Sequence, residues 1–307
     1  MDEYIDSHVI IPASIMRGFF IKGKVKQTFV YEIGNNTDIL LPRIKKYGNV
    51  YAYYEPHTET ALGSIETQFG TVKNSIIKGL NNNGTYILND EERIVTNLFI
   101  ATCFARCRKM ASLVQNASFF CNLLGLELSP SDPVDNALKI YPKGELLDKF
   151  NISFLINNSS TNLVCPENCL YSPLKHLDSL SVTECILFPI SPKYALILSL
   201  QSCENTKIDN DEIIRSFNSD ALLSVFTTSS TFIISSTEEE LKFLQALSET
   251  KEFQNKAYLM ILYDKVKNSN NLHKDLNETE KGILIFYKDF LLPIIKEKLV
   301  NAKIISS

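Results

Sequence analysis

Five side chains stand out in the sequence because of the chemistry that they could share. They are His8, Arg17, Glu66, Arg106 and Glu167. A histidine and carboxylates can move protons near neutral pH, and arginines can hold a phosphate through paired hydrogen bonds. Gathered in one pocket, these groups fit a hydrolase and, in particular, a nuclease. We therefore take them as the candidate catalytic set; the sequence assigns no metal ligand to it and does not identify a cofactor.

Glu66 lies within an apolar stripe of an expected helix, between Leu62 and Phe69. A buried carboxylate without a partner is strongly destabilising, so a partner is expected. Arg106 lies in the middle of an apolar face of the next expected helix and is the candidate. One interpretation is an ion pair that fixes the register of two helices, and the other is a polar cleft with a functional carboxylate. Either way, we expect Glu66 and Arg106 to be in contact.

His8 and Arg17 are nine residues apart, on either side of Pro12. Proline disfavours helix at the preceding residue and suits the first turn of a helix. We therefore expect an extended run up to Ile11 and a helical turn after it, which would direct both His8 and Arg17 toward the interior. His8 would then be either a general acid or base or a hydrogen-bonded structural histidine.

The cysteines include two pairs with C-x-x-x-C spacing, Cys103 with Cys107 and Cys165 with Cys169. Four thiolates can hold zinc in a tetrahedral site. The spacing is longer than that of a zinc knuckle, however, and the first pair falls on an expected helix. We expect buried, reduced thiols and no zinc at these positions.

Composition and charge exclude several classes of protein. With 45% hydrophobic and 21% charged residues among 307, the chain is expected to fold, and its net charge of -4 gives no global field for nucleic acid or an acidic membrane. The start, MDEYIDSH, is acidic and no apolar run of ~20 residues occurs, so we expect a cytoplasmic protein without a membrane span. The Walker, G-x-G-x-x-G, H-E-x-x-H and G-x-S-x-G motifs are all absent from the sequence.

The periodicity of apolar residues predicts an α+β fold. Strands are expected at residues 28–32, 39–41, 51–54, 151–156, 187–190, 194–200 and 231–235, and we expect the first three to form one small antiparallel sheet at the start of the chain. Helices are expected at 58–80, from 89 to about 124, at 210–226, and from 237 onward. Capping boxes at Asn89 with Glu92 and at Thr237 with Glu240 mark two helix starts. We expect one compact body of short antiparallel strands and long central helices (residues 1–235), with a C-terminal helical extension (residues 236–307) packed on it.

The segment HVIIPASIMRGFF also resembles a known family. Its His8, Pro12, Arg17 and Phe19 have the spacing of the H-x-x-V-P-x-x-x-L-R-x-F opening of a widespread bacterial family, domain of unknown function 4238. Further matching segments follow in order: TFVYE, GNVYAYY, Glu59 and Glu66, NDEER, FARCRK with Arg106 and Arg108, and FPISP. The similarity covers residues 8 to about 235.

Two positions depart from the family's pattern. Val9 replaces a frequent second histidine, and Glu167, in a Pro-Glu-Asn-Cys run, lies where the family usually has an S-D-N-P turn. The resemblance implies a cytoplasmic bacterial protein of α+β type, of a sort associated with mobile or defence loci.

Two functions are compatible with these observations. The first is a nuclease-like hydrolase in a defence or toxin role, with nucleic acid as its partner. The alternative is a non-catalytic interaction or regulatory protein, with a protein partner and with structural roles for the buried charges. Clustering of His8 and Arg17 beside Glu66 and Arg106 in an open concavity would favour the first, and separation or full burial the second.

Overall fold

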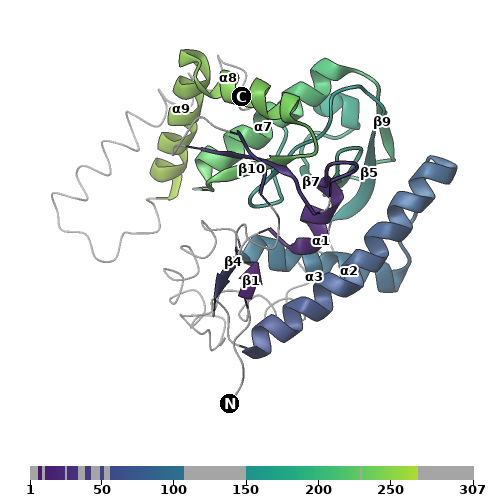
Figure 1. Ribbon diagram of the computed structural model, residues 1–307. Helices are drawn as coiled ribbons and strands as arrows, with labels where there is room; N and C mark the ends of the chain where they lie inside the picture. The colour runs from purple at the N-terminus through teal and green to yellow at the C-terminus, as the bar shows by residue number, and fades with distance from the viewer. Residues whose placement is uncertain are drawn as a thin grey trace, which may run out of the picture. The chain divides into compact units, whose positions relative to one another are not determined.

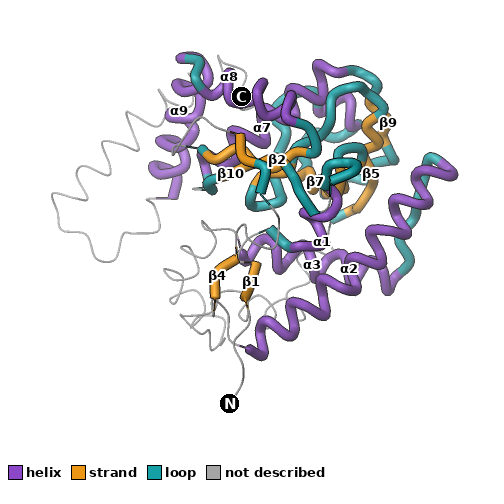
Figure 2. The backbone as a smooth tube through the Cα atoms, in the orientation of Figure 1, coloured by secondary structure: helices purple, strands orange, loops and turns teal. Residues whose placement is uncertain are grey.

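The computed structural model describes residues 6–8, 11–24, 26–33, 39–42, 49–51, 56–106, 150–228 and 230–268. The chain divides into two compact units, Met1–Leu244 and Gln245–Ser307. The division that the sequence suggests after residue 235 stays a prediction. Within the described residues, helices accompany two four-stranded sheets, so the α+β class is confirmed (Figure 1, Figure 2).

The first sheet joins strands from distant parts of the first unit. Its order is β3-β2-β10-β6, with antiparallel pairing throughout. The strands are β2 (Phe29–Glu32), β3 (Ile39–Leu40), β6 (Cys165–Pro166) and β10 (Phe232–Ser235). Val30 pairs with Leu40 on one side and Ile234 on the other, and Ile234 pairs with Cys165. Val30 and Ile234 are fully buried because they lie on the two central strands.

The N-terminal strands pair differently from the sequence prediction of one small opening sheet. β4 (Asn49–Tyr51) pairs with β1 (Asp6–His8) in a separate two-stranded sheet, while β2 has β10 as its second neighbour. The prediction of a single N-terminal sheet is therefore wrong. Residue spacing within a strand reports which face is buried and does not identify a partner far along the chain.

The second sheet has the order β7-β8-β5-β9. Its strands are β5 (Asn151–Asn157), β7 (Ile186–Ser191), β8 (Tyr194–Ser199) and β9 (Thr206–Ile208). β5 and β9 are parallel, and the other pairs are antiparallel. Phe154, Leu196 and Phe188 are opposite one another across three strands, and all three belong to the main hydrophobic cluster. This face of the sheet is therefore a wall of the core.

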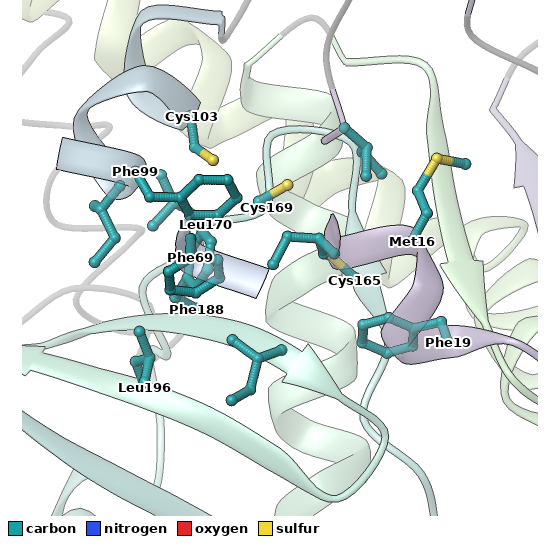
Figure 3. Packing of buried hydrophobic residues seen from close by; sticks show 14 of the residues in the cluster. Met16, Phe19, Phe69, Phe99, Cys103, Cys165, Cys169, Leu170, Phe188 and Leu196 are labelled. Atoms are coloured by element: carbon teal, nitrogen blue, oxygen red, sulfur yellow. The ribbon is translucent and has the colours of Figure 1, made fainter. Parts of the chain in front are cut away.

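Two long helices, α2 (Pro56–Asn83) and α3 (Asp90–Arg106), pack against each other and supply the opposite wall of the core (Figure 1). The expected apolar stripe of α2 is buried; its members are Leu62, Ile65, Phe69, Val72, Ile76 and Leu80. The rings of Phe69 and Phe99 stack with centroids 3.9 Å apart, and both meet Phe188 edge-on (Figure 3). Aromatic packing thus joins both helices to the second sheet.

The remaining helical elements in the described ranges are α1 (Ala13–Met16), η1 (Arg17–Phe19), η4 (Leu177–Leu180), α7 (Asp211–Thr227), α8 (Glu238–Ser248) and α9 (Lys251–Asn268). α9 belongs to the second unit. None of the helices in the described ranges has the length and apolar character needed to cross a membrane.

One of the two predicted capping boxes is confirmed. Glu92 N donates to Asn89 Oδ1 at 2.9 Å, and Asn89 N donates to Glu92 Oε2 at 3.1 Å. The second box is wrong, because Glu240 Oε1 accepts from the backbone of Asn162 at 2.9 Å while the amide of Thr237 donates to Ser235 Oγ at 3.2 Å. The carboxylate of Glu240 therefore holds a distant loop and not its own helix start.

Candidate functional site

The N-terminal segment with the family-like spacing forms a short helical turn that starts at Pro12, as expected. Ile15 N and Met16 N donate to Pro12 O at 3.0 and 3.1 Å. The side chains of Ile15, Met16 and Phe19 are buried in the hydrophobic cluster, and Figure 3 shows Met16 and Phe19 there. Hydrophobic burial therefore fixes this turn to the core from one side.

Arg17 does not point inward. Its side chain is exposed, and Nε donates to Ala13 O at 3.2 Å, one turn earlier. The prediction that Arg17 faces the interior is therefore wrong. The reason is that the α-helical turn continues into the tighter η1, where Phe19 occupies the buried position. The guanidinium is thus available at the surface of the segment.

Gly18 brings this turn against the second sheet. A Cβ at residue 18 would lie 2.2 Å from the carbonyl oxygen of Ile190. The register of β7 against β8 shifts between Pro189 and Ser191, and such irregularities redirect backbone groups. The RGF turn and the FPIS strand, two of the segments on which the family resemblance rests, are therefore in direct contact.

Lys73, on α2, is the most unusual ionisable group next to this turn. Its side chain is only 6% exposed, and Nζ donates to the carbonyl oxygen of Ser14 on α1. Burial, together with the positive charge of Arg17, lowers the pKa of Lys73 to about 8. A buried lysine with a lowered pKa is a recurrent feature of catalytic sites, because its amine can act as a base or nucleophile.

Sequence reasoning missed Lys73 although a signal was present. The stripe of α2 places core residues at Leu62, Ile65 and Phe69, and Glu66 has the same offset from Leu62 that Lys73 has from Phe69. Both charged residues therefore replace an apolar residue in the repeat. The structure buries Lys73 and leaves Glu66 half-buried.

The hydroxyl of Ser14 lies beside the same lysine contact. Ser14 is 3% exposed, and its Oγ has no hydrogen-bond partner among the residues that the structure describes. Buried hydroxyls nearly always have a partner, and exceptions call for an explanation.

The structure describes His8 and Arg106 at the level of the backbone. His8 ends β1, where its Cα pairs with that of Asn49, and Arg106 is the last residue of α3. Their side chains lie outside the described residues. Glu66 lies on α2, which packs against α3. The side chain of Glu66 is not without an interaction. Contact between Glu66 and Arg106 stays a prediction.

Glu167 is a fully buried carboxylate that binds the start of β10. Its Oε2 accepts from the backbone amide of Thr231 and from Thr231 Oγ1, the latter at 3.2 Å. Glu167 N donates to Phe232 O at 3.0 Å. These bonds fasten the turn after β6 to the neighbouring strand, which is what a structural residue does.

Replacing Glu167 tests this structural role. Glu167→Ala is expected to lower the free energy of unfolding by about 2 kcal/mol, because it leaves the amide and hydroxyl of Thr231 without their acceptor. Glu167→Gln retains an oxygen acceptor of the same reach and should cost clearly less. Urea denaturation of both variants measures the difference. Equal stability of Glu167→Ala and wild type would show that the bonds to Thr231 do not stabilise the fold.

The cysteines of the candidate zinc site that the structure describes belong to the hydrophobic core. Cys103, Cys165 and Cys169 are buried in the cluster that includes Leu170 and Phe99 (Figure 3). Burial of these thiols as small apolar groups is confirmed. Cys107 lies outside the described residues. The described ranges contain no cluster of three or more His, Cys, Asp or Glu side chains suited to a metal ion, and the expectation of no zinc stays a prediction.

A second polar cluster holds the loop after β5. Asp211, at the start of α7, accepts from Ser160 Oγ at 2.7 Å and from Thr161 N at 2.9 Å. These hydrogen bonds hold the pKa of the Asp211 carboxyl well below its usual range. Lys193 Nζ donates to Ser159 O at 2.6 Å. Asp211 and Lys193 each make hydrogen bonds with the loop at residues 159–161, so we assign this cluster a structural role.

Comparison with models of protein families, with curated proteins and with solved structures finds no match to the chain. The resemblance to domain of unknown function 4238 therefore stays a prediction. The candidate site is defined by its own geometry: exposed Arg17, buried Lys73 and the turn at Ser14 that separates them.

Proposed function

We propose that the protein is a nuclease-like hydrolase whose site lies where the α1–η1 turn meets α2, and that it acts in the cytoplasm of a bacterium in a defence or toxin-type role. The observation that carries this proposal is that the buried amine of Lys73 contacts Ser14 O, on the same short turn that exposes the guanidinium of Arg17. The two charges interact, and the positive charge of Arg17 contributes to the lowered pKa of Lys73. One cation is exposed and the other is buried, so the two can have different tasks.

Arg17 has the properties of a phosphate ligand. Its guanidinium is exposed and permanently charged, and the Nε bond to Ala13 O orients it while the remaining N–H groups stay available. Lys73 has the properties of a proton acceptor. With a pKa of about 8, part of its amine is neutral near neutral pH, and general bases work best when their pKa is near the working pH.

Glu66 and His8 supply further groups for proton transfer in this proposal. Glu66 precedes Lys73 by two helical turns, about 10 Å along the axis, and therefore faces a similar direction. His8 precedes Pro12 by four residues, so the chain itself limits its distance from the turn. Arg106 would pair with Glu66. The bonds of Glu167 with Thr231 fit support of the sheet better than chemistry.

Hydrolysis of nucleic acids by purified variants tests the proposed function. Arg17→Met and His8→Ala are each expected to lower the rate of phosphodiester hydrolysis by 100-fold or more, while the free energy of unfolding stays within about 1 kcal/mol of wild type. Substrates are labelled single- and double-stranded DNA and RNA, between pH 6 and 9, with and without Mg²⁺. Lys78→Met, on the exposed face of α2, is the matched control and should retain full activity.

Two results would contradict this function. The first is wild-type protein that cleaves none of these substrates, and the second is full activity of Arg17→Met. A His8→Ala variant that fails to fold would identify His8 as a structural histidine and remove it from the site, while Arg17→Met would still decide the proposal.

The full burial of Glu167 favours a second candidate function, that of a non-catalytic interaction or regulatory protein. In that case the buried charges only hold elements together, as Glu167 holds β10 and Lys73 holds α1. Protein lacking all hydrolytic activity, with biological function that survives Arg17→Met and His8→Ala, would support this alternative.

A further inference from the structure

We propose that Ser14 is the nucleophile of the site and Lys73 its general base, so that hydrolysis proceeds through a covalent phosphoserine. This inference rests on the proposed function for its substrate, a phosphodiester. The inference gives Ser14 a chemical role in addition to the hydrogen bond that its carbonyl oxygen accepts from Lys73.

The first observation is the state of the Ser14 hydroxyl. It is almost completely removed from solvent, and the described residues offer its Oγ no hydrogen-bond partner. Folded proteins rarely leave a buried hydroxyl unpaired, and catalytic groups are among the exceptions. No partner among the described residues therefore holds this hydroxyl in one staggered position about the Cα–Cβ bond.

The second observation is the position of the Lys73 amine. Nζ donates to the carbonyl oxygen of Ser14, so the amine is bound to the residue that carries the hydroxyl, although it makes no hydrogen bond to Oγ itself. Lys73 comes from α2 and Ser14 from α1, and the two helices pack against each other. Packing of two separate elements therefore positions the pair.

The third observation is electrostatic. Burial and Arg17 lower the pKa of Lys73 to about 8, which makes the neutral amine accessible near neutral pH. Serine hydroxyls are weak nucleophiles until a neighbouring base takes the proton, and serine–lysine pairs are a known solution. Arg17 follows Ser14 by three residues and exposes its guanidinium, where it would hold the phosphate of the substrate.

The reaction balances in two steps. The Lys73 amine accepts the hydroxyl proton while Ser14 Oγ forms a bond to phosphorus, and the bond from phosphorus to the leaving oxygen breaks. The Lys73 ammonium gives this proton to the leaving oxygen. Water then attacks the phosphoserine and gives a proton to Lys73; the bond between Oγ and phosphorus breaks, and the proton returns to Oγ.

Labelling with diisopropyl fluorophosphate tests the pair without any nucleic acid. Attack by Ser14 Oγ on this probe forms the same kind of oxygen–phosphorus bond and releases fluoride. Peptide mass spectrometry of the full-length protein is expected to find the label on Ser14, with a labelling rate that rises with pH around a midpoint near 8. Ser14→Ala should lose the label, and Lys73→Met should slow it at least 50-fold. Ser64→Ala, at an exposed serine of α2, is the matched control and should be labelled like wild type.

The result that overturns the inference is a wild-type protein with no label on Ser14 between pH 7 and 9, or a Lys73→Met variant labelled as fast as wild type. Circular dichroism confirms that each variant is folded. Ser14→Cys provides a second measurement, because the new thiol should react with iodoacetamide faster when Lys73 is present than in the double variant with Lys73→Met. Equal rates would also count against the pair.

The nuclease assay separates failure of this inference from failure of the proposed function. If Arg17→Met loses hydrolysis while Ser14→Ala retains it, the nucleophile is not Ser14 and the proposed function stands. If Ser14 is labelled but the protein cleaves no nucleic acid, the serine–lysine pair stands and the phosphodiester substrate is wrong.

Discussion

Between pH 7 and pH 10.5, the free energy of unfolding of the wild-type protein is expected to rise by about 3 kcal/mol relative to that of Lys73→Met. The cause is the buried amine of Lys73, whose pKa falls from 10.5 to about 8 in the folded protein. Between these two pH values the unfolded chain binds more protons than the folded one. The free energy of unfolding of the wild-type protein, relative to that of Lys73→Met, therefore increases as pH rises through this window.

Chemical denaturation of both proteins across this pH range measures the effect, and the difference between them cancels the titration of all other groups. Lys78→Met removes an exposed lysine from the same helix and should follow the wild-type curve to within about 0.5 kcal/mol. Parallel curves for wild type and Lys73→Met would show that Lys73 is not held in a desolvated state. They would also remove the main support for its role as a base.

Because Lys73 destabilises the fold at neutral pH, its presence calls for an explanation other than stability, and function is one. An apolar residue at the same position of the α2 repeat would complete the stripe between Phe69 and Ile76 without desolvating a charge. Active sites are places where such unfavourable environments are found, because the same burial that destabilises the charged amine makes it a better proton acceptor. The pH dependence therefore bears on function as well as on stability.

Long periodic elements could be predicted from the sequence because their signal is local. The stripe of α2 and the capping box at Asn89 were both confirmed, since each depends on residues within a few turns of one another. The sheets could not be predicted to the same extent. β10 joins β2 and β6, and no spacing rule relates Ile234 to Val30 or Cys165. β6 is two residues long and has no periodicity at all.

The candidate site was predicted in part. Pro12 starts a helical turn as expected, yet Arg17 faces solvent because η1 places Phe19 in the core. The sequence identifies Glu167 as a candidate catalytic carboxylate, and only the tertiary structure shows that it binds Thr231. Lys73 has an apolar offset in the α2 repeat, but lysine is common on helices, and its contact with α1 depends on a separate element. In each case the missing information was which neighbour the side chain meets.

Gly18→Ala is expected to lower the free energy of unfolding by about 3 kcal/mol, at the upper end of overpacking effects. The added Cβ would lie 2.2 Å from the backbone oxygen of Ile190, well inside any real contact. Because the clash is with backbone and not with the flexible end of a side chain, η1 must move away from β7. Such a movement also shifts Arg17, so the alanine variant should lose hydrolytic activity even under conditions where it remains folded.

Gly63→Ala is the matched control, since a Cβ at residue 63 of α2 would have no atom within 4 Å. There the same substitution should be neutral or stabilise the helix by up to about 1 kcal/mol, because alanine has the higher helix propensity. Urea denaturation compares the two variants directly. If Gly18→Ala is as stable as Gly63→Ala, η1 does not dock on β7 at this glycine, and the arrangement that positions Ser14, Arg17 and Lys73 around a single turn is incorrect.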